Sequence, residues 1–174
     1  MVHACWHPDH MAYLQAQQLL GNNNTLTDAL LLEGSRKGST AYNAVETVLK
    51  GMEVPLPAGR VFHDKDGHPR SHVRVKWWKQ NGSLRDLAMG APQESDIPED
   101  DIPQEHLVSY GTEEKPLFLG HYWLQGEPAP LASNVACLDY SVAKPGGKLV
   151  AYRWDGEKIL DSRHFVAVNR FETD

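Results

Sequence analysis

The sequence predicts an α/β fold, in which a mixed and mainly antiparallel β-sheet is flanked by helices. Three observations predict it: a strand-like apolar segment at residues 2–5, a block of amphipathic helical patterns up to residue 51, and a run of short strand patterns after residue 115. The length of 174 residues and the hydrophobic content of 41% fit a single domain, residues 1–174, whose core needs no disulfides.

The first helix is expected directly after the strand at residues 2–5. Pro8 and Asp9 suit a first helical turn, because proline lacks a donor that would go unused there and an acid complements the helix dipole. Its apolar side would run from Met11 to Leu20, and the sequence "GNNN" would end it.

Two more helices are predicted before residue 51. Thr25 or Thr27 would cap the second, with Leu26, Ala29, Leu30 and Leu31 as its buried set. The third follows the cap Ser39 and has the clearest helical spacing of apolar residues: Ala41, Ala44, Val45, Val48 and Leu49.

The middle of the chain predicts an extended linker at residues 52–59 and then a β-hairpin at residues 59–78 with "KDG" at its turn. The sequence "DKDG" resembles the start of a calcium loop, but the acid ladder and closing glutamate are absent, so a turn is favoured. Residues 83–90 suggest a short helix. The acidic run at residues 93–105 is interrupted by prolines and is interpreted as a solvated loop.

The last third changes to strands separated by turn residues. The strand patterns lie at residues 115–120, 131–141, 147–152 and 164–171, and "RWDGEK" is expected to turn a hairpin between "KLVAY" and "KILDS".

Composition limits the partners and the compartment. The net charge of −6 argues against a nucleic-acid polymer as partner. No apolar stretch reaches the length of about 20 residues that a membrane helix needs. Cys5 and Cys137, in apolar strand patterns, are expected to be free buried thiols. These features predict a cytoplasmic protein without a membrane partner.

Among nine histidines, His3 and His121 share one placement, because each ends a buried strand pattern. Gly120 before His121 would let the backbone turn sharply. Strand ends present ligands, and neutral imidazole is the commonest metal ligand in proteins. As an alternative, His7 and His10 can share a helical face and, with His3 or Cys5, form a zinc site.

Three further sets of residues have two interpretations each. Trp6 and Tyr122 can line a substrate mouth or pack in the core. Asp139 can orient a metal ligand or cap a strand end. The basic residues of the hairpin can contact substrate phosphates or form a solvated face: Arg70, Arg74, Lys76 and Lys79.

At these residues the sequence resembles the calcineurin-like metallophosphoesterase superfamily, and in particular its bacterial serine/threonine-phosphatase-like and symmetrical dinucleoside-tetraphosphatase-like members. Two blocks carry the resemblance: "VHACW" at residues 2–6, and residues 118–157, which begin "FLGHYW". Residues 7–114 resemble the helical and hairpin insertion of some members. The resemblance implies a partial metallophosphoesterase fold.

The resemblance also implies a metal centre. His3 and His121 would be ligands of one of two divalent ions, Mn, Fe, Zn or Ni, which in such centres lie about 3.5–4 Å apart and activate a bridging hydroxide. The substrate implied is a phosphorylated protein or a nucleotide.

The sequence departs from the family in one large respect. The family's three motifs Asp-x-His, Gly-Asp-x-x-Asp-Arg and Gly-Asn-His-Glu/Asp, which supply most ligands and the general acid, do not occur in it. We therefore expect the chain to be the C-terminal half of a metal-dependent phosphoesterase, inactive without a missing N-terminal half, and we assign no catalytic residue.

Two alternatives stay open at this point. The chain can be a non-catalytic interaction module or one half of a split protein, with an exposed sheet edge and apolar face. It can also be a small mononuclear metal-binding hydrolase that uses His3, His7, His10 and His121.

Overall fold

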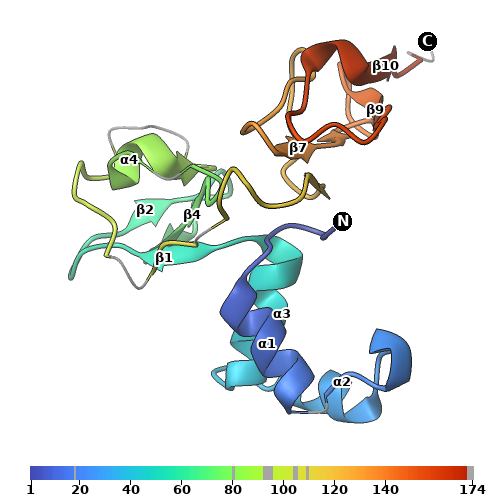
Figure 1. Ribbon diagram of the computed structural model, residues 1–174. Coiled ribbons are helices and arrows are strands. Elements are labelled where there is room, and N and C mark those ends of the chain that lie inside the picture. Colours follow the sequence, from blue (N-terminus) through green and yellow to red (C-terminus); the bar gives the residue numbers. More distant parts are fainter. Residues whose placement is uncertain (18, 80, 92–95, 104–105, 109, 172–174) are drawn as a thin grey trace. The chain divides into compact units, whose positions relative to one another are not determined.

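The computed structural model contains both helices and strands, so the predicted α/β class is confirmed at that level (Figure 1). It describes residues 1–17, 19–79, 81–91, 96–103, 106–108 and 110–171. The chain divides into two compact units, Cys5–Ser109 and Met1–Ala4 with Tyr110–Asp174. The single domain with an insertion at residues 7–114 stays a prediction.

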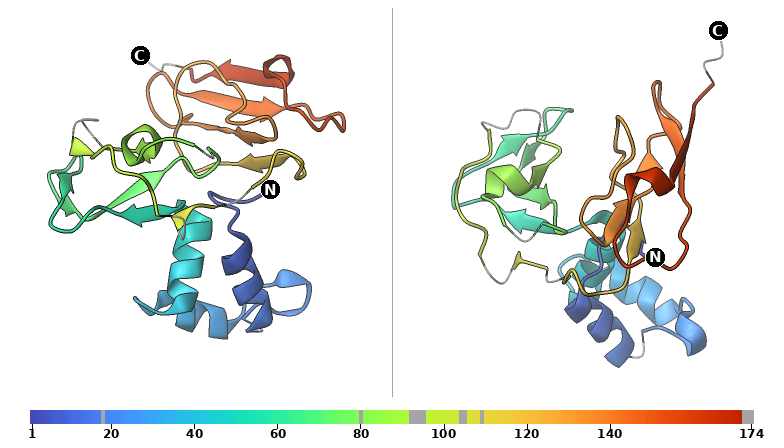
Figure 2. Two further views of the ribbon diagram at one scale, coloured as in Figure 1. Left: turned by 60° about the vertical axis from the view of Figure 1, so that its left-hand side comes forward. Right: turned by 45° about the horizontal axis from the view of Figure 1, so that its top comes forward.

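The unit Cys5–Ser109 begins with three helices, of which α1 and α2 both pack against α3 (Figure 2). They are α1 (Pro8–Ala16), α2 (Asp28–Ser35) and α3 (Thr40–Lys50). Thr27, not Thr25, caps α2, and Ser39 caps α3 as predicted, because each side chain accepts a hydrogen bond from a free N–H of the first turn. Their core consists of Leu14, Leu19, Leu30, Ala41 and Ala44.

Two expectations about these helices are wrong in detail. Helix α1 ends at Ala16, so the pair Leu19–Leu20 follows it instead of belonging to it. Of the four residues expected to be buried around α2 only Leu30 is, because neighbouring residues of a short helix point in different directions and one contact with α3 buries a single stripe.

A three-stranded antiparallel sheet follows the helices, in the order β1–β4–β5, with a short hairpin and helix beside it. The elements are β1 (Glu53–Pro55), β2 (Phe62–His63), β3 (Pro69–Arg70), β4 (His72–Val75), α4 (Leu84–Leu87) and β5 (Ala88–Met89). Strands β2 and β3 form a hairpin around the predicted turn, but the return strand expected at residues 72–78 is wrong, because β4 pairs with β1 and β5 instead of with β2. The expected linker at residues 52–59 instead contains β1, which pairs with β4 and buries Val54 against Val73.

The other unit is built from short strands. Its elements are β6 (Leu117–Leu119), β7 (Val135–Cys137), β8 (Asp139–Tyr140), β9 (Lys148–Tyr152), the 3₁₀ helix η4 (Ser162–His164) and β10 (Phe165–Asn169). Strands β6 and β7 are parallel, and β10–β9–β8 form an antiparallel sheet.

The predicted strand at residues 2–5 is wrong, because residues 1–7 lie outside any strand, although two backbone hydrogen bonds join their first part to the segment of β6. The Val2 N–H donates to the Phe118 carbonyl at 3.1 Å and the Gly120 N–H donates to the His3 carbonyl at 2.9 Å, so the first residues run along β6. Cys5, by contrast, donates its N–H to Val48 at 3.3 Å in the helical unit.

The predicted hairpin between "KLVAY" and "KILDS" is wrong. Strand β9 pairs with β10 along its whole length, from Phe165 opposite Tyr152 to Asn169 opposite Lys148. The segment 158–161 lies outside any strand, although Leu160 is buried and its N–H donates to the Ser133 carbonyl at 2.7 Å. The sequence "DG" follows β9 as expected, but the strand that pairs with β9 begins only at residue 165.

No helix among the described residues is both long and apolar enough to cross a membrane. In the acidic run, residues 93–95, 104 and 105 lie outside the described residues. Residues 97–103 belong to no helix or strand, as predicted for a loop, but Ile97 and Ile102 are buried, so this part of the run is not solvated throughout.

Candidate functional site

The two strand-end histidines meet in the unit built around β6. His3 ends the segment that runs along β6, and His121 lies two residues after the end of β6. Their ring centroids lie 5.2 Å apart, with the ring planes tilted by 58°. Because the two segments run side by side, two residues far apart in the sequence present their imidazoles near the end of β6.

The backbone at His121 is strained. His121 has φ of 70° and Trp123 has φ of 49°, in the left-handed region that bulky residues avoid at a cost of about 1–2 kcal/mol each. Gly120, expected to provide the sharp turn, does not have a positive φ, and a Cβ there would lie 3.7 Å from Asp139 Cβ and the His3 carbonyl. The turn conformation is therefore adopted at His121 and Trp123 instead of at the glycine.

Hydrogen bonds fix the residues on either side of this strained turn. The Tyr122 hydroxyl donates to the Ala4 carbonyl at 3.0 Å, and the Leu124 N–H donates to the Asp139 carbonyl at 2.9 Å. The first contact holds the loop that carries His121 against the segment that carries His3, and the second holds it against β8. Tyr122 thus has a structural contact, and the structure assigns it no role at a substrate mouth.

Asp139 lines a hollow of about 500 Å³ that also has His3 and Gly120 in its wall. Its Oδ1 accepts the Ser141 N–H at 3.1 Å, which is the strand-end capping role that was one of its two expected roles. The hollow is otherwise mainly apolar, being lined by Met1, Val2, Phe118, Leu119 and Leu138.

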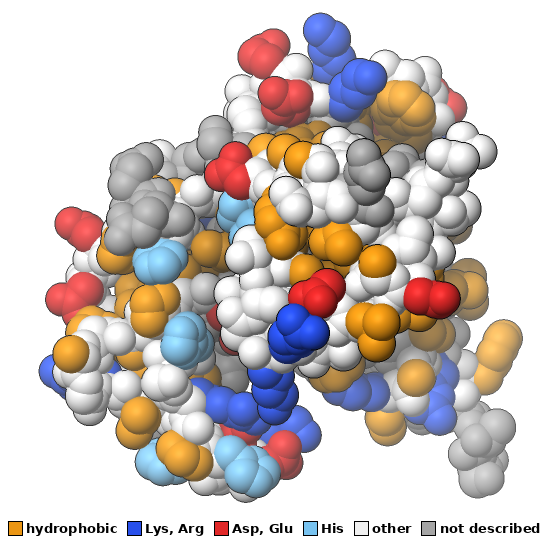
Figure 3. All heavy atoms as spheres, turned by 90° about the horizontal axis from the view of Figure 1, so that it is seen from below, with side chains coloured by type: hydrophobic (Ala, Val, Ile, Leu, Met, Phe, Trp, Pro, Cys, Tyr) orange, Lys and Arg blue, Asp and Glu red, His pale blue; other side chains and the backbone are white. Residues whose placement is uncertain are grey.

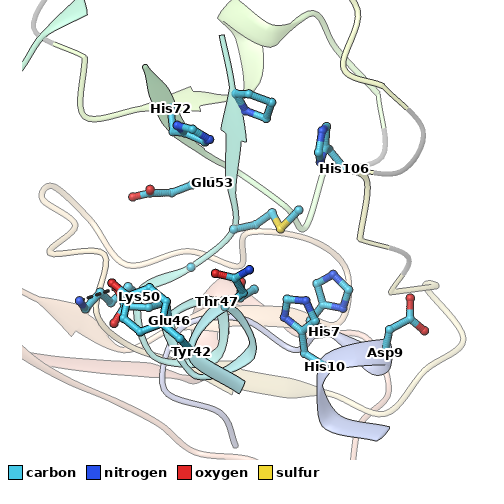
Figure 4. A pocket seen from close by; sticks show the side chains of 14 residues that line it. His7, Asp9, His10, Tyr42, Glu46, Thr47, Lys50, Glu53, His72 and His106 are labelled. Atoms are coloured by element: carbon cyan, nitrogen blue, oxygen red, sulfur yellow. Dashed lines mark hydrogen bonds and ion pairs between the residues drawn. The ribbon is translucent and has the colours of Figure 1, made fainter. Parts of the chain in front are cut away.

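His7 and His10 form a second histidine pair, inside the unit Cys5–Ser109. They line a cavity of about 660 Å³, with Glu53, His72 and His106 also in its wall (Figure 4). The two rings stack at 3.9 Å and 8°, and the Nδ1 atom of each is buried without a hydrogen-bond partner. Burial lowers the pKa of both imidazoles below the usual value, so both are neutral at pH 7.

Cys5 is a poor third ligand for that pair. It is a free, fully buried thiol, as is Cys137, which confirms the prediction for both. Desolvation raises the pKa of Cys5 to about 12 and that of Cys137 to about 11, so neither supplies a thiolate at neutral pH.

Within the described part of the chain, one group of three possible ligand side chains is compact enough to hold a metal ion: Asp64, Asp66 and His68. Asp64 is already fully engaged. Its Oδ1 accepts the N–H groups of Asp66 and His68 at 3.0 and 2.9 Å, and its Oδ2 accepts two bonds from Arg70. The backbone bond from His68, followed by the bond from Arg70, lowers the Asp64 pKa to about 2. This carboxylate organises the hairpin turn that the sequence predicts.

Three of the four basic residues of the hairpin region are engaged with protein groups. Arg70 pairs with Asp64 at 2.7 Å, Arg74 pairs with Glu53 at 3.0 Å, and Lys76 donates to the Asp86 carbonyl at 3.0 Å. These contacts favour the solvated face over a phosphate site. Trp6, which was expected either to line a substrate mouth or to pack in the core, is half-buried.

Trp123 and Lys144 lie near the candidate site and were not predicted from the sequence. Trp123 is 57% exposed, and the Lys144 ammonium lies 4.4 Å from the centroid of its ring. The His121 and Trp123 ring centroids are 6.1 Å apart, so Trp123 borders the His3–His121 pair, and Lys144 lies against Trp123. An aromatic run after a buried strand predicts packing, and only the left-handed backbone shows that Trp123 points to solvent. Other imidazoles also reach the surface, among hydrophobic side chains (Figure 3).

No family model, curated protein or solved structure matches this chain. The resemblance to metallophosphoesterases therefore continues to rest on its two sequence blocks.

Proposed function

We propose that His3 and His121 bind one divalent ion of a phosphoester-hydrolysing centre, and that this chain is the histidine-bearing part of a metallophosphoesterase. The observation that carries the proposal is the approach of the two rings to 5.2 Å beside the end of β6. The order of the two sequence blocks, with these histidines in the matching positions, supports the same assignment. The proposed substrates are a phosphorylated protein or a nucleotide, and the proposed compartment is the cytoplasm.

The residues fit part of the ligand shell of one ion. Within the described residues, no third histidine, cysteine, aspartate or glutamate forms a compact ligand group with this pair. Two imidazoles suit Mn, Fe, Zn or Ni but leave most coordination positions to other groups. The described residues do not fit a two-ion centre alone, and the carboxylate ligands must come from another polypeptide segment.

The chain's own contribution is to orient the two imidazoles. The Gly120–His3 hydrogen bond fixes the separation of their backbones, and the strained turn at His121 directs its ring toward His3. Bound ions in such centres stabilise the charge that develops on a phosphoryl group and lower the pKa of bound water.

Zinc titration followed by calorimetry tests the assignment. We expect weak binding that is lost in His3→Ala and in His121→Ala, because one remaining imidazole holds an ion poorly. His63→Ala is the matched control, since His63 is exposed and lies in the other unit. Zinc binding that survives both site variants would overturn the proposal.

A second candidate function, an interaction module or split-protein half, is favoured by one face of the β9–β10 pair. Leu149 and Val168 are opposite each other in the register, as are Ala151 and Val166. All four are exposed, with Leu149 at 64% and the two valines at 54% and 53%. An apolar sheet face of this kind normally packs against another layer. Light scattering that shows a monomer at high concentration, unchanged by Leu149→Lys with Val168→Lys, would argue against this function.

A further inference from the structure

Trp123 and Lys144 form a recognition element beside the histidine pair. Trp123 projects to solvent although its backbone conformation is unfavourable, and it is held there by the hydrogen bonds of Tyr122 and Leu124 on either side. A large aromatic side chain that is exposed and rigidly presented is typical of a surface that stacks on planar ligands.

Lys144 is presented with similar rigidity. Its N–H donates to the Ser141 carbonyl at 2.7 Å and its carbonyl accepts the Gly147 N–H at 3.0 Å. Ser141 is buried and has φ of 58°, and the Gly147 Cα packs against the Ser141 backbone so closely that a side chain would not fit. This tight loop fixes the Lys144 backbone, and the Lys144 ammonium lies 4.4 Å from the centroid of the indole, where cation–π attraction favours it.

The element continues into the histidine pair. The His121 ring lies 6.1 Å from the Trp123 ring and 5.2 Å from the His3 ring, and the Lys144 ammonium lies against Trp123, so the four side chains form a row of successive neighbours from His3 to Lys144. An ammonium attracts phosphate oxygens, and the exposed part of the indole accepts a planar ring.

We propose that this row selects phosphate esters that carry a planar ring, with the ring stacked on Trp123 and the phosphate paired with Lys144 close to His121. The proposal rests on the proposed function in assigning the phosphoryl group to the histidine pair. A nucleoside phosphate and phosphotyrosine both carry a planar ring and a phosphate, so both fit the proposed site. Phosphoserine, which has no ring, does not.

The test follows the indole N–H resonance of Trp123 by heteronuclear NMR while adenosine monophosphate, phosphotyrosine or phosphoserine is added in the presence of a chelator. The chain has five tryptophans, and the resonance is assigned with Trp123→Phe. We expect saturable shifts with one or both ring-bearing esters and none with phosphoserine. The ester that binds shows whether the ligand is a nucleotide or a phosphotyrosine. Equal shifts with all three, or none with the ring-bearing esters, would overturn the proposal.

Variants locate the interaction. Trp123→Leu should weaken binding about tenfold, as expected for the loss of one stacked ring. Lys144→Gln should weaken binding of the phosphate esters but not that of adenosine. Trp154→Leu is the matched control, because Trp154 is 53% exposed in the same unit and its indole N–H donates to Glu157 at 2.9 Å. If Trp154→Leu has the larger effect, the assignment is wrong.

The chelator separates this inference from the proposed metal site. Ring-dependent shifts without metal, together with no zinc binding, would leave the recognition element standing and remove the metal site. Zinc binding at His3 and His121 without any ring-dependent shift would support the metal site and overturn the recognition element.

Discussion

At the scale of single residues, the loop between β8 and β9 depends on the absence of a side chain at residue 147. A Cβ there would overlap the Ser141 carbonyl and lie 2.9 Å from that of Lys144, and both contacts are with backbone that cannot move aside cheaply. We expect Gly147→Ala to lower the free energy of unfolding by about 3 kcal/mol, measured by urea denaturation. In Gly111→Ala the nearest atom is 4.0 Å away, so that control should be close to neutral. Equal stability of the two variants would contradict the structure.

The stacked pair His7 and His10 makes a prediction about pH. Because burial lowers the pKa of both folded imidazoles, the unfolded chain binds more protons over the range just below the ordinary value of 6.5. Their contribution to stability is therefore complete above pH 6.5 and is lost as the pH falls through that range.

Denaturation midpoints measured between pH 7 and pH 5 check this expectation. The decrease in stability should become smaller in His7→Gln and in His10→Gln. His63→Gln serves as control, since His63 is exposed. A pH dependence identical in all four proteins would show that the buried pair does not titrate as proposed.

At the scale of elements, the cap of α3 joins two helices. The Ser39 hydroxyl oxygen accepts the Tyr42 N–H at 3.0 Å, and the hydroxyl donates to the Glu33 carbonyl in α2 at 2.8 Å. Ser39→Ala should cost about 1–2 kcal/mol, because it removes both the cap and the link to α2. Ser35→Ala is the control, as its hydroxyl is exposed and bonds only within its own helix. Thermal melting that ranks Ser35→Ala as the more harmful change would contradict this account.

Elements defined by local signals could be predicted from the sequence. The caps at Thr27 and Ser39 and the turn around Asp64 are recognisable because their hydrogen bonds join residues a few positions apart. Strand β1 and the β9–β10 pairing could not be predicted from the sequence. Val54 pairs with Val73, and Lys148 pairs with Asn169, so the partners lie far apart in the chain. Pairing partners far along the chain depend on the assembled fold and leave little local trace.

The same distinction holds for the candidate site. His3 and His121 could be singled out because each ends an apolar strand pattern, and a strand end is a local feature. Trp123 could not, because its exposure depends on a left-handed backbone that no residue type at that position indicates. The stacking of His7 on His10 and the loss of hydrogen-bond partners are likewise visible only in three dimensions.

At the scale of the whole molecule, the isolated chain should not turn over a generic phosphomonoester. The histidine pair lacks carboxylate partners among the described residues, so it cannot position two ions and the attacking hydroxide. A p-nitrophenyl phosphate assay with added manganese or zinc should show no rate above the metal alone. Robust turnover that disappears in His3→Ala would mean that the chain supplies a complete centre.

The central claim is that His3 and His121 bind the same ion. Side-chain NMR of histidine-labelled protein during a zinc titration tests it most directly. We predict that the resonances of these two imidazoles shift together with one dissociation constant, and that those of His121 stop shifting at the same zinc concentrations in His3→Ala. If the resonances of His7 and His10 shift first while those of His3 and His121 stay unchanged, the metal site lies at the stacked pair and the account given for the strand-end pair is wrong.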